Sequence, residues 1–359
     1  MSKDSPPVVA VGLSGGVDSA VAALLLKERG YRLLGLFMKT WPGLPANGQT
    51  GFSGCYGPDE EDLKAAEKVA KFLAIPFHVV DLIQPFREKV ITYFVREYQG
   101  GRTPNPCVVC NRLIKFDLLL QTARVQGLHF EYFATGHYAR VDYQPGSRRY
   151  LLKKGADPGK DQSYFLYLLT QRQLKKALFP LGDYRKELVR HLADEAGLPV
   201  SQREESQDFT PDRKFLFSEK MQPGPVYSTG GRLLGYHQGI ACYTVGQRQG
   251  LGIATGKPLY VIRIEAERNA LIVGTADQCR KRQVRVCPVH YVSVDPLEKP
   301  KRVMAKLRST QPPAPATLYP ESKRRVRLIF DQAQWAVTPG QSAVFYDGEL
   351  LLGGGIIKS

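Results

Sequence analysis

Residues 14–19 read Ser-Gly-Gly-Val-Asp-Ser and follow directly after an apolar run, residues 7–13, that is typical of a buried strand. From Val17 onward the apolar residues take helical spacing, and this pattern ends at Gly30. A strand that turns through two glycines into a helix presents backbone N–H groups at the helix N-terminus, where an anion binds favourably. The glycines allow close approach of that anion. The segment therefore predicts an anion site, with Asp18 beside it as a group suited to a metal or a ribose.

The first part of the chain alternates between strand-like and helical hydrophobic spacing. Strand-like runs cover residues 7–13, 31–38, 76–82 and 130–136. Helical spacing covers residues near 17–29, 59–74, 84–98 and 112–126, and helix signals continue from 171 to 196. This order predicts an α/β fold with a doubly wound parallel sheet and ligands at the carboxyl ends of its strands. The two long intervening segments, 41–58 and 99–111, are then expected to be active-site loops.

The pattern changes after about residue 210 to short strands separated by glycine and proline turns. One such block covers residues 223–275, and the runs from about 281 to 359 indicate a small antiparallel β-barrel. The chain is also long for a single hydrophobic core. We therefore predict three domains: a catalytic domain over 1–210, a β-rich central domain over 211–280 and a C-terminal barrel over 281–359.

The charge of the chain points to an acidic partner. The 359 residues carry a formal net charge of +16, and residues 281–359 contain 13 Lys and Arg against 6 Asp and Glu. This excess favours nucleic acid as the partner and the last module as an RNA-binding appendage. The N-terminus shows no apolar signal segment, and no run is long enough to span a membrane. Six cysteines without a secretory signal indicate reduced thiols in the cytoplasm.

Several segments together carry a family resemblance. Residues 14–19 lack the lysine of the G-x-x-x-x-G-K-[ST] loop and resemble instead the pyrophosphate loop of enzymes that cleave ATP between the α- and β-phosphates. With this loop, the order and spacing of seven further segments resemble those of the tRNA-specific 2-thiouridylases. These segments are FMKTW (37–41), TPNPCVVCNRLIKF (103–116), ATGHYAR (134–140), KDQSYFLYLL (160–169), FPLGDYRKELVR (179–190), ESQDF (205–209) and TVGQRQGLGI (244–253).

The resemblance implies an adenylating enzyme of the pyrophosphate-loop type that thiolates the wobble uridine of certain tRNAs. ATP, with Mg²⁺, would activate the C2 oxygen of uracil, and sulfur would then replace that oxygen with release of AMP. The base must leave any stack to react, which favours a single-stranded anticodon loop. The resemblance places ATP on Gly12, Leu13, Ser14, Gly15, Gly16, Val17, Asp18, Ser19, Met38 and Gly136. It places tRNA on His137, Lys160, Asp161, Gln162, Arg308 and Gln341.

The cysteines depart from the family pattern. The best-known members carry one catalytic cysteine in an Asp-x-x-Cys loop, which matches Cys110, and a second one that aligns here with Thr210. Threonine cannot form the disulfide of the usual persulfide relay. Cys107 stands in place of the aspartate, and Cys55 lies in the preceding long loop. Three thiols in two active-site loops suit an iron–sulfur cluster. We therefore predict a [4Fe–4S] cluster on Cys55, Cys107 and Cys110, with the fourth iron open to bind sulfide, as in related three-cysteine thiolation enzymes.

Two other readings of the cysteines stay open. Cys107 and Cys110 can form the redox pair themselves, with a persulfide on Cys110 that Cys107 resolves. A structural zinc with His137 as a fourth ligand is the other reading. The sulfur donor, sulfide or a persulfide carrier, is not specified. The remaining cysteines, in strand-like contexts, are expected to be small core residues: Cys242, Cys279 and Cys287.

Two other functions also remain open. One is a different pyrophosphate-loop enzyme, such as an ammonia-using amidating synthetase, which needs neither the three thiols nor the basic barrel. The other is a non-catalytic RNA-binding protein that has kept a nucleotide fold. One expected tRNA contact is weakened, because Arg308-Ser309-Thr310 stands where family members often have Arg-Tyr-Arg.

Overall fold

The computed structural model describes residues 6–41, 59–204, 217, 221–253 and 256–359. The chain forms two compact units, and each is described by itself. The first unit contains residues 1–89, 107–211 and 349–351, and the second contains residues 90–106, 212–348 and 352–359.

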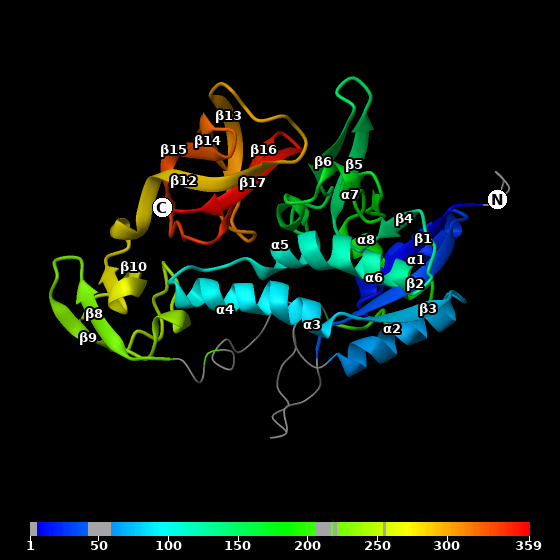
Figure 1. Ribbon diagram of the computed structural model, residues 1–359, viewed down its shortest axis with the longest axis horizontal. Coiled ribbons are helices and arrows are strands. Elements are labelled where there is room, and N and C mark those ends of the chain that lie inside the picture. The colour runs from blue at the N-terminus through cyan, green and yellow to red at the C-terminus, as the bar shows by residue number, and fades with distance from the viewer. Residues whose placement is uncertain (1–5, 42–58, 205–216, 218–220, 254–255) are drawn as a thin grey trace. The chain divides into compact units, whose positions relative to one another are not determined.

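A parallel sheet organises the first unit, with the strand order β3-β2-β1-β4-β7 (Figure 1). Its strands are β1 (Val8–Gly12), β2 (Arg32–Lys39), β3 (Phe77–Asp81), β4 (Tyr132–Ala134) and β7 (Ala177–Leu178). On β1, Val9 pairs with Leu33 of β2 on one side and with Tyr132 of β4 on the other. The strands that follow β1 in the chain therefore lie on its β2 side first and on its β4 side later. The order reverses between β1 and β4, which is where ligands of such sheets bind.

Helices connect these strands in the order that the hydrophobic spacing predicts. They are α1 (Val17–Glu28), α2 (Glu60–Phe72), α3 (Ile83–Phe86), α5 (Pro106–Cys110), α6 (Leu119–Val125), α7 (Gln171–Leu174) and α8 (Lys186–Glu195). A π-helical stretch, Arg87–Ile91, continues α3, and a second one, Asn111–Leu118, joins α5 to α6. A 3₁₀ turn covers Ser163–Leu166. A hairpin of β5 (Ala139–Gln144) and β6 (Arg149–Lys154) also belongs to this unit.

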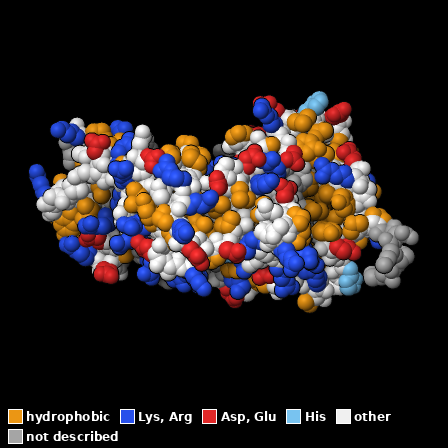
Figure 2. Space-filling model, turned by 90° about the horizontal axis from the view of Figure 1, so that it is seen from above, with side chains coloured by type: hydrophobic (Ala, Val, Ile, Leu, Met, Phe, Trp, Pro, Cys, Tyr) orange, Lys and Arg blue, Asp and Glu red, His pale blue; other side chains and the backbone are white. Residues whose placement is uncertain are grey.

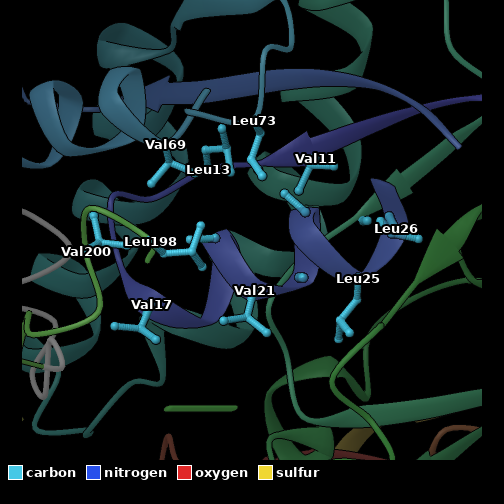
Figure 3. Close-up of a cluster of buried hydrophobic side chains, with 14 of the residues drawn as sticks. Val11, Leu13, Val17, Val21, Leu25, Leu26, Val69, Leu73, Leu198 and Val200 are labelled. Atoms are coloured by element: carbon cyan, nitrogen blue, oxygen red, sulfur yellow. The ribbon is translucent and has the colours of Figure 1, made fainter. Parts of the chain in front are cut away.

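The core of the first unit forms around α1, which has little polar surface. Val17, Ala20 and Val21 are buried on this helix, and its side chains gather with those of β1, α2 and the segment after α8 (Figure 3). Each such aliphatic side chain contributes about 1.5–3 kcal/mol when it is fully removed from water. This packing fixes the start of α1 relative to the carboxyl end of β1, which sets the geometry of the loop between them.

The α/β prediction is confirmed, and a strand interrupts the helix signals predicted from 171 to 196. The four predicted strands and the four helices between residues 17 and 126 are present within a few residues of their expected limits. The helix signals from 171 to 196 correspond instead to α7, the edge strand β7 and α8. Pro180 and Gly182 lie between β7 and α8 and interrupt the helical spacing. The hairpin β5–β6 was not predicted either.

The second unit contains a small mixed sheet with the order β10-β11-β8-β9. Its strands are β8 (Gly224–Ser228), β9 (Leu233–His237), β10 (Tyr260–Glu265) and β11 (Ala270–Gly274). Helix α4 (Thr92–Gln99) and the 3₁₀ turns Ile240–Cys242, Ala266–Arg268 and Asp277–Cys279 also lie in this unit. Val226, Val261 and Leu271 are fully buried between these elements.

Six antiparallel strands form a closed barrel, as the sequence predicts (Figure 1). They are β12 (Arg280–Tyr291), β13 (Lys301–Lys306), β14 (Ala314–Ser322), β15 (Arg325–Trp335), β16 (Ser342–Asp347) and β17 (Leu350–Ile357). Their order is β12-β15-β14-β13-β16-β17, and β17 pairs with β12 to close the ring. Phe330, Phe345 and Tyr346 are fully buried within it. The barrel therefore has a packed interior.

Candidate active site

The loop between β1 and α1 has the conformation that an anion site requires. Gly15 has a φ of +77°, and Gly16 caps α1 with φ −92° and ψ 161°. No side chain caps the helix. The Ser14 N–H donates to Ser19 Oγ at 3.2 Å, and Ser19 Oγ donates to the Gly16 carbonyl at 3.0 Å. The loop is thus closed by its own serines, while the N–H groups of the first helical turn lack a side-chain acceptor.

The segment after β4 packs directly against this turn. A Cβ atom on Gly136 would lie 2.7 Å from the Asp18 carbonyl carbon and 2.8 Å from the Ser19 nitrogen. Two backbones therefore meet here at a distance that only glycine permits. The predicted partners from the ends of β1 and β4 come together at the point where the strand order reverses.

Asp18 lies in the first turn of α1 and has two side-chain donors on the same oxygen. Lys186 Nζ is 2.7 Å from Asp18 Oδ1, and Tyr138 Oη donates to that oxygen at 2.8 Å. The Lys186 side chain is 9% exposed, whereas that of Asp18 is 30% exposed. Tyr138 is fully buried. Lys186 and Tyr138 therefore hold the carboxylate through one oxygen, and the Asp18 side chain stays partly exposed.

Arg203 fixes the other end of the loop. Its Nη1 donates to the Gly15 carbonyl at 2.9 Å, and its Nη2 pairs with Asp62 Oδ1 at 2.9 Å. A Cβ on Gly15 would also meet the backbone of Asp62 on α2. The positive φ of Gly15 and this close approach explain why glycine is required here.

The remaining predicted nucleotide residues lie along the same strand ends. Gly12 is the last residue of β1, and Leu13 is buried behind the loop. Met38 lies near the carboxyl end of β2, opposite Val80 of β3, and is half-buried. Its predicted contact with adenine stays a prediction.

Cys107 and Cys110 occupy one helical turn. Both lie on α5, three residues apart, so their thiols emerge on the same side of the helix. Cys110 is buried, Cys107 is half-buried, and neither forms a disulfide. Cys55 and Thr210 lie outside the described residues. Within the described part of the chain, which excludes Cys55, no three His, Cys, Asp or Glu side chains are arranged to hold a metal ion.

His137 is enclosed by aromatic rings. Its ring centroid lies 6.2 Å from that of Phe116 and 6.1 Å from that of Phe179, and its Nδ1 is 2.7 Å from Thr135 Oγ1. Burial, with a smaller contribution from the charge of Lys115, lowers the pKa of His137 to about 3. The ring is therefore neutral at physiological pH, and some of its surface stays exposed. Its roles toward tRNA or zinc stay predictions.

The segment 160–162 uses its side chains within the fold. Asp161 Oδ1 accepts hydrogen bonds from the Gly155 and Ser163 N–H groups at 3.1 and 3.0 Å. Gln162 Oε1 accepts from the Tyr138 N–H at 3.1 Å. Lys160 is half-buried in the same turn. These contacts hold the turn beside Tyr138, which in turn binds Asp18.

In the second unit, the two residues predicted to contact tRNA are held by backbone groups. Arg308 Nη2 donates to the Val245 and Ala336 carbonyls at 3.1 and 3.2 Å and to Thr338 Oγ1 at 2.7 Å. Gln341 Nε2 donates to the Pro104 carbonyl at 3.2 Å. Both residues therefore connect segments within this unit. Cys279 is buried as expected, whereas Cys242 and Cys287 are half-buried.

Sequence reasoning assigned no role to Lys186, Tyr138 or Arg203. Lys186 and Tyr138 both lie in segments that carry the family resemblance, so their positions were marked although their partner was not. Arg203 stands outside those segments and carries no signal in the sequence. Its contact with Gly15 depends on how α2 and the segment after α8 pack.

The surface is basic without being uniform. Figure 2 shows Lys and Arg side chains spread over one face, with Asp and Glu side chains among them. Among the described residues, no helix combines the length and the apolar character needed to cross a membrane.

Comparison with known proteins places the chain in a family. The tRNA methyl transferase HUP domain matches residues 7–210, the tRNA methyl transferase PRC-barrel domain residues 214–275, and the aminomethyltransferase β-barrel domain residues 281–357. The solved structure of NMN synthetase from Francisella tularensis overlaps 56% of this chain and 67% of its own, at 17% identity and a TM-score of 0.32.

Relatives match over almost the whole chain. The tRNA-specific 2-thiouridylase MnmA of Acetivibrio thermocellus is 45% identical over 358 residues, which cover 98% of this chain and 99% of the relative. The tRNA-specific 2-thiouridylase MnmA 2 of Caldanaerobacter subterraneus subsp. tengcongensis is 47% identical over 358 residues, which cover 98% and 97%. The chain therefore belongs to the tRNA-specific 2-thiouridylase family.

Proposed function

We propose that this protein catalyses the ATP-dependent 2-thiolation of the wobble uridine of tRNA. The observation that carries the proposal is the α1 N-terminus, which has no side-chain cap and follows a parallel strand at the reversal of the strand order. Relatives named as tRNA-specific 2-thiouridylases, similar along nearly their full length, supply the substrate class.

The first step would make C2 of the base reactive. The uracil C2 oxygen is a poor leaving group, and its attack on the α-phosphorus of ATP would convert it to an adenylate with release of pyrophosphate. The N–H groups at the start of α1 would bind the phosphates, and Gly15 and Gly136 would permit the close backbone contacts that hold this turn in place. Asp18 offers a partly exposed carboxylate, the ligand type that Mg²⁺ prefers, so it fits a magnesium site. Bound Mg²⁺ would neutralise charge on the phosphates.

The second step would bring sulfur to C2 from the cysteine site. Cys107 and Cys110, one turn apart on α5, fit two ligand positions of a [4Fe–4S] cluster, and Cys55 is the proposed third. When bound, such a cluster would supply sulfide to the activated base, and AMP would leave. The protein's own contribution would be to hold Cys110 on α5, where its side chain is buried.

The alternative route uses the same two described thiols without iron. A donor would leave a persulfide on Cys110, whose terminal sulfur would attack C2 and displace AMP. The Cys107 thiolate would then attack Cys110 Sγ, forming a Cys107–Cys110 disulfide and releasing the thiolated base. An external dithiol would reduce that disulfide before the next cycle.

The basic C-terminal barrel supports tRNA as the partner. Residues 281–359 have an excess of seven positive charges, which favours binding to a phosphate backbone. We retain His137, Lys160, Asp161, Gln162, Arg308 and Gln341 as proposed tRNA contacts, and the three-domain division as the proposed organisation. A single-stranded anticodon loop presents the wobble base without the cost of opening a duplex.

Two measurements test this function. ATP–pyrophosphate exchange should require tRNA, and 2-thiouridine should appear in tRNA that is incubated with the protein, ATP and a sulfur source. Exchange that depends on an amino acid or a free nucleotide would point to an amidating enzyme. No exchange and no thiouridine, with tRNA binding intact, would indicate a non-catalytic RNA-binding protein.

Iron analysis then separates the two sulfur routes. Protein purified without oxygen should contain about four iron and four sulfide per chain if a [4Fe–4S] cluster is present. No iron, with thiolation supported by a persulfide donor, would assign the step to Cys110 and Cys107.

A further inference from the structure

A buried lysine contacts the aspartate in the first turn of α1. Lys186 is the first residue of α8 and is 7% exposed. Its backbone N–H donates to Asp157 Oδ2 at 3.0 Å, which fixes the start of the helix. Its Nζ ends 2.7 Å from Asp18 Oδ1. A cation at this depth requires a compensating charge, and Asp18 provides it.

Tyr138 adds a second contact to the same group. Its hydroxyl donates to Asp18 Oδ1 at 2.8 Å, and the Lys186 ammonium lies 5.9 Å from the centroid of its ring. Two donors from different elements thus converge on one carboxylate oxygen. The side chain of Asp18 is held in one orientation, on the turn whose N–H groups face the anion site.

Asp18 on its own would oppose the proposed ligand. A carboxylate in the first turn of α1 already occupies the favourable end of the helix dipole, and it repels a polyphosphate that approaches the same N–H groups. We infer that Lys186 neutralises Asp18 so that the N-terminus of α1 accepts the polyphosphate chain. Lys186 is then a charge-balancing and positioning residue of the nucleotide site. This inference rests on the proposed function only in that the loop binds ATP or pyrophosphate.

The test measures binding of inorganic pyrophosphate to the full chain by titration calorimetry, without divalent metal. Lys186→Met should weaken binding roughly tenfold, which corresponds to about 1.4 kcal/mol of repulsion at a distance of several ångströms. Lys186→Arg keeps the charge and should retain most of the affinity. ATP without metal should follow the same order.

The double variant separates charge balance from a purely structural role. In Asp18→Asn/Lys186→Met both charges are removed, so pyrophosphate affinity should return to within about threefold of the unmodified protein. A double variant that binds as weakly as Lys186→Met would overturn the inference. Asp18→Asn alone removes the carboxylate and keeps the Lys186 charge, so it should bind pyrophosphate more tightly than the unmodified protein. That variant keeps the test decisive even if Lys186→Met does not fold.

A matched control and a second readout complete the design. Lys175→Met removes one positive charge from an exposed position and should leave pyrophosphate binding unchanged. If the unmodified chain binds neither pyrophosphate nor ATP, the proposed nucleotide site fails. If it binds both and Lys186→Met binds equally well, only the inference about Lys186 fails.

Discussion

Arg203 Nη1 donates a hydrogen bond to the carbonyl oxygen of Gly15 at 2.9 Å, although the two residues are 188 positions apart. The same guanidinium pairs with Asp62 of α2 through Nη2. The conformation of the loop between β1 and α1 is therefore supported from outside the strand and helix that it joins. A chain segment far from β1 and α1 contributes to the preorganisation of the proposed anion site.

Loss of the Arg203 guanidinium should loosen this loop. We expect Arg203→Met to lower the free energy of unfolding by about 1 kcal/mol, because the group is partly exposed and screened. We expect it also to weaken ATP binding several-fold, about fivefold, because the Gly15 carbonyl loses its anchor. Chemical denaturation and calorimetry measure the two effects. Arg302→Met, which breaks an exposed ion pair with Asp331 in the barrel, should leave ATP affinity unchanged. Equal ATP affinity in the two variants would contradict a role for Arg203.

Gly136 permits a close backbone contact in the site, and alanine should not fit there. Its Cβ would lie under 3.0 Å from backbone atoms of Asp18 and Ser19, which belong to a buried helix and cannot move aside. We expect Gly136→Ala to cost about 1–3 kcal/mol of stability and to reduce ATP binding more than tenfold. Gly146→Ala, at a position with open space around it, is the control. Thermal unfolding and ATP titration of both variants are the measurements, and a Gly136→Ala protein that binds ATP normally would disprove the contact.

Cys110 should be required for sulfur transfer and dispensable for binding. Its removal leaves β1, α1 and Gly136 intact, so we expect Cys110→Ala to lose at least about a hundredfold of its thiolation rate while ATP and tRNA binding change little. Cys279→Ala, which removes a buried thiol from the second unit, serves as the control for thiol loss. Quantification of 2-thiouridine by mass spectrometry gives the result. Full thiolation by Cys110→Ala would exclude both sulfur routes.

His137 should make the fold sensitive to acid. Burial holds its pKa near 3 in the folded chain, whereas the unfolded value is close to 6.5. Between these pH values His137 binds a proton in the unfolded state but not in the folded state. Stability therefore falls as the pH decreases from about 6.5 toward 3. We expect the denaturant midpoint of His137→Gln to depend less on pH across this window than that of the unmodified protein.

His191→Gln is the matched control for this effect, because its side chain is 70% exposed. Its pH dependence should equal that of the unmodified protein. Identical pH profiles for all three proteins would mean that His137 is not buried in its neutral form. Other groups that titrate in the same range are common to the three proteins and cancel in the comparison.

The sequence predicted those features that depend on local chemistry. Hydrophobic periodicity located the strands and helices of the parallel sheet, and the two glycines after β1 located the turn that leads into α1, because both signals lie within a short window of residues. The barrel was also predicted, since its strands alternate apolar and polar residues between turn residues. The resemblance placed Met38, Asp18 and Gly136 at the nucleotide, and the structure brings the backbones of Asp18 and Gly136 into contact.

Features that depend on long-range packing were not predicted. The two residues of β7 are too few for a periodic pattern, and the strand exists because Phe133 and Ala134 of β4 provide a pairing edge. In the sequence, nothing distinguishes Lys186 from an ordinary charged residue at a helix start. It becomes a partner of Asp18 because α8 packs against α1. Likewise Asp161 and Gln162 are predicted tRNA contacts, and only the folded structure shows that one side-chain oxygen of each accepts a backbone N–H.

The pairing of β17 with β12 has a consequence for the folding of the barrel during synthesis. The first and last strands of the barrel are 70 residues apart when counted from the start of β12 to the start of β17, and every strand between them is completed before the ring closes. During synthesis, β12 and β16 each present an unpaired edge until Leu350–Ile357 has emerged from the ribosome. Such edges are templates for pairing with other chains. The two edges of the barrel therefore close when its last strand pairs with them. A nascent chain that stalls before β17 exposes both unpaired edges at once.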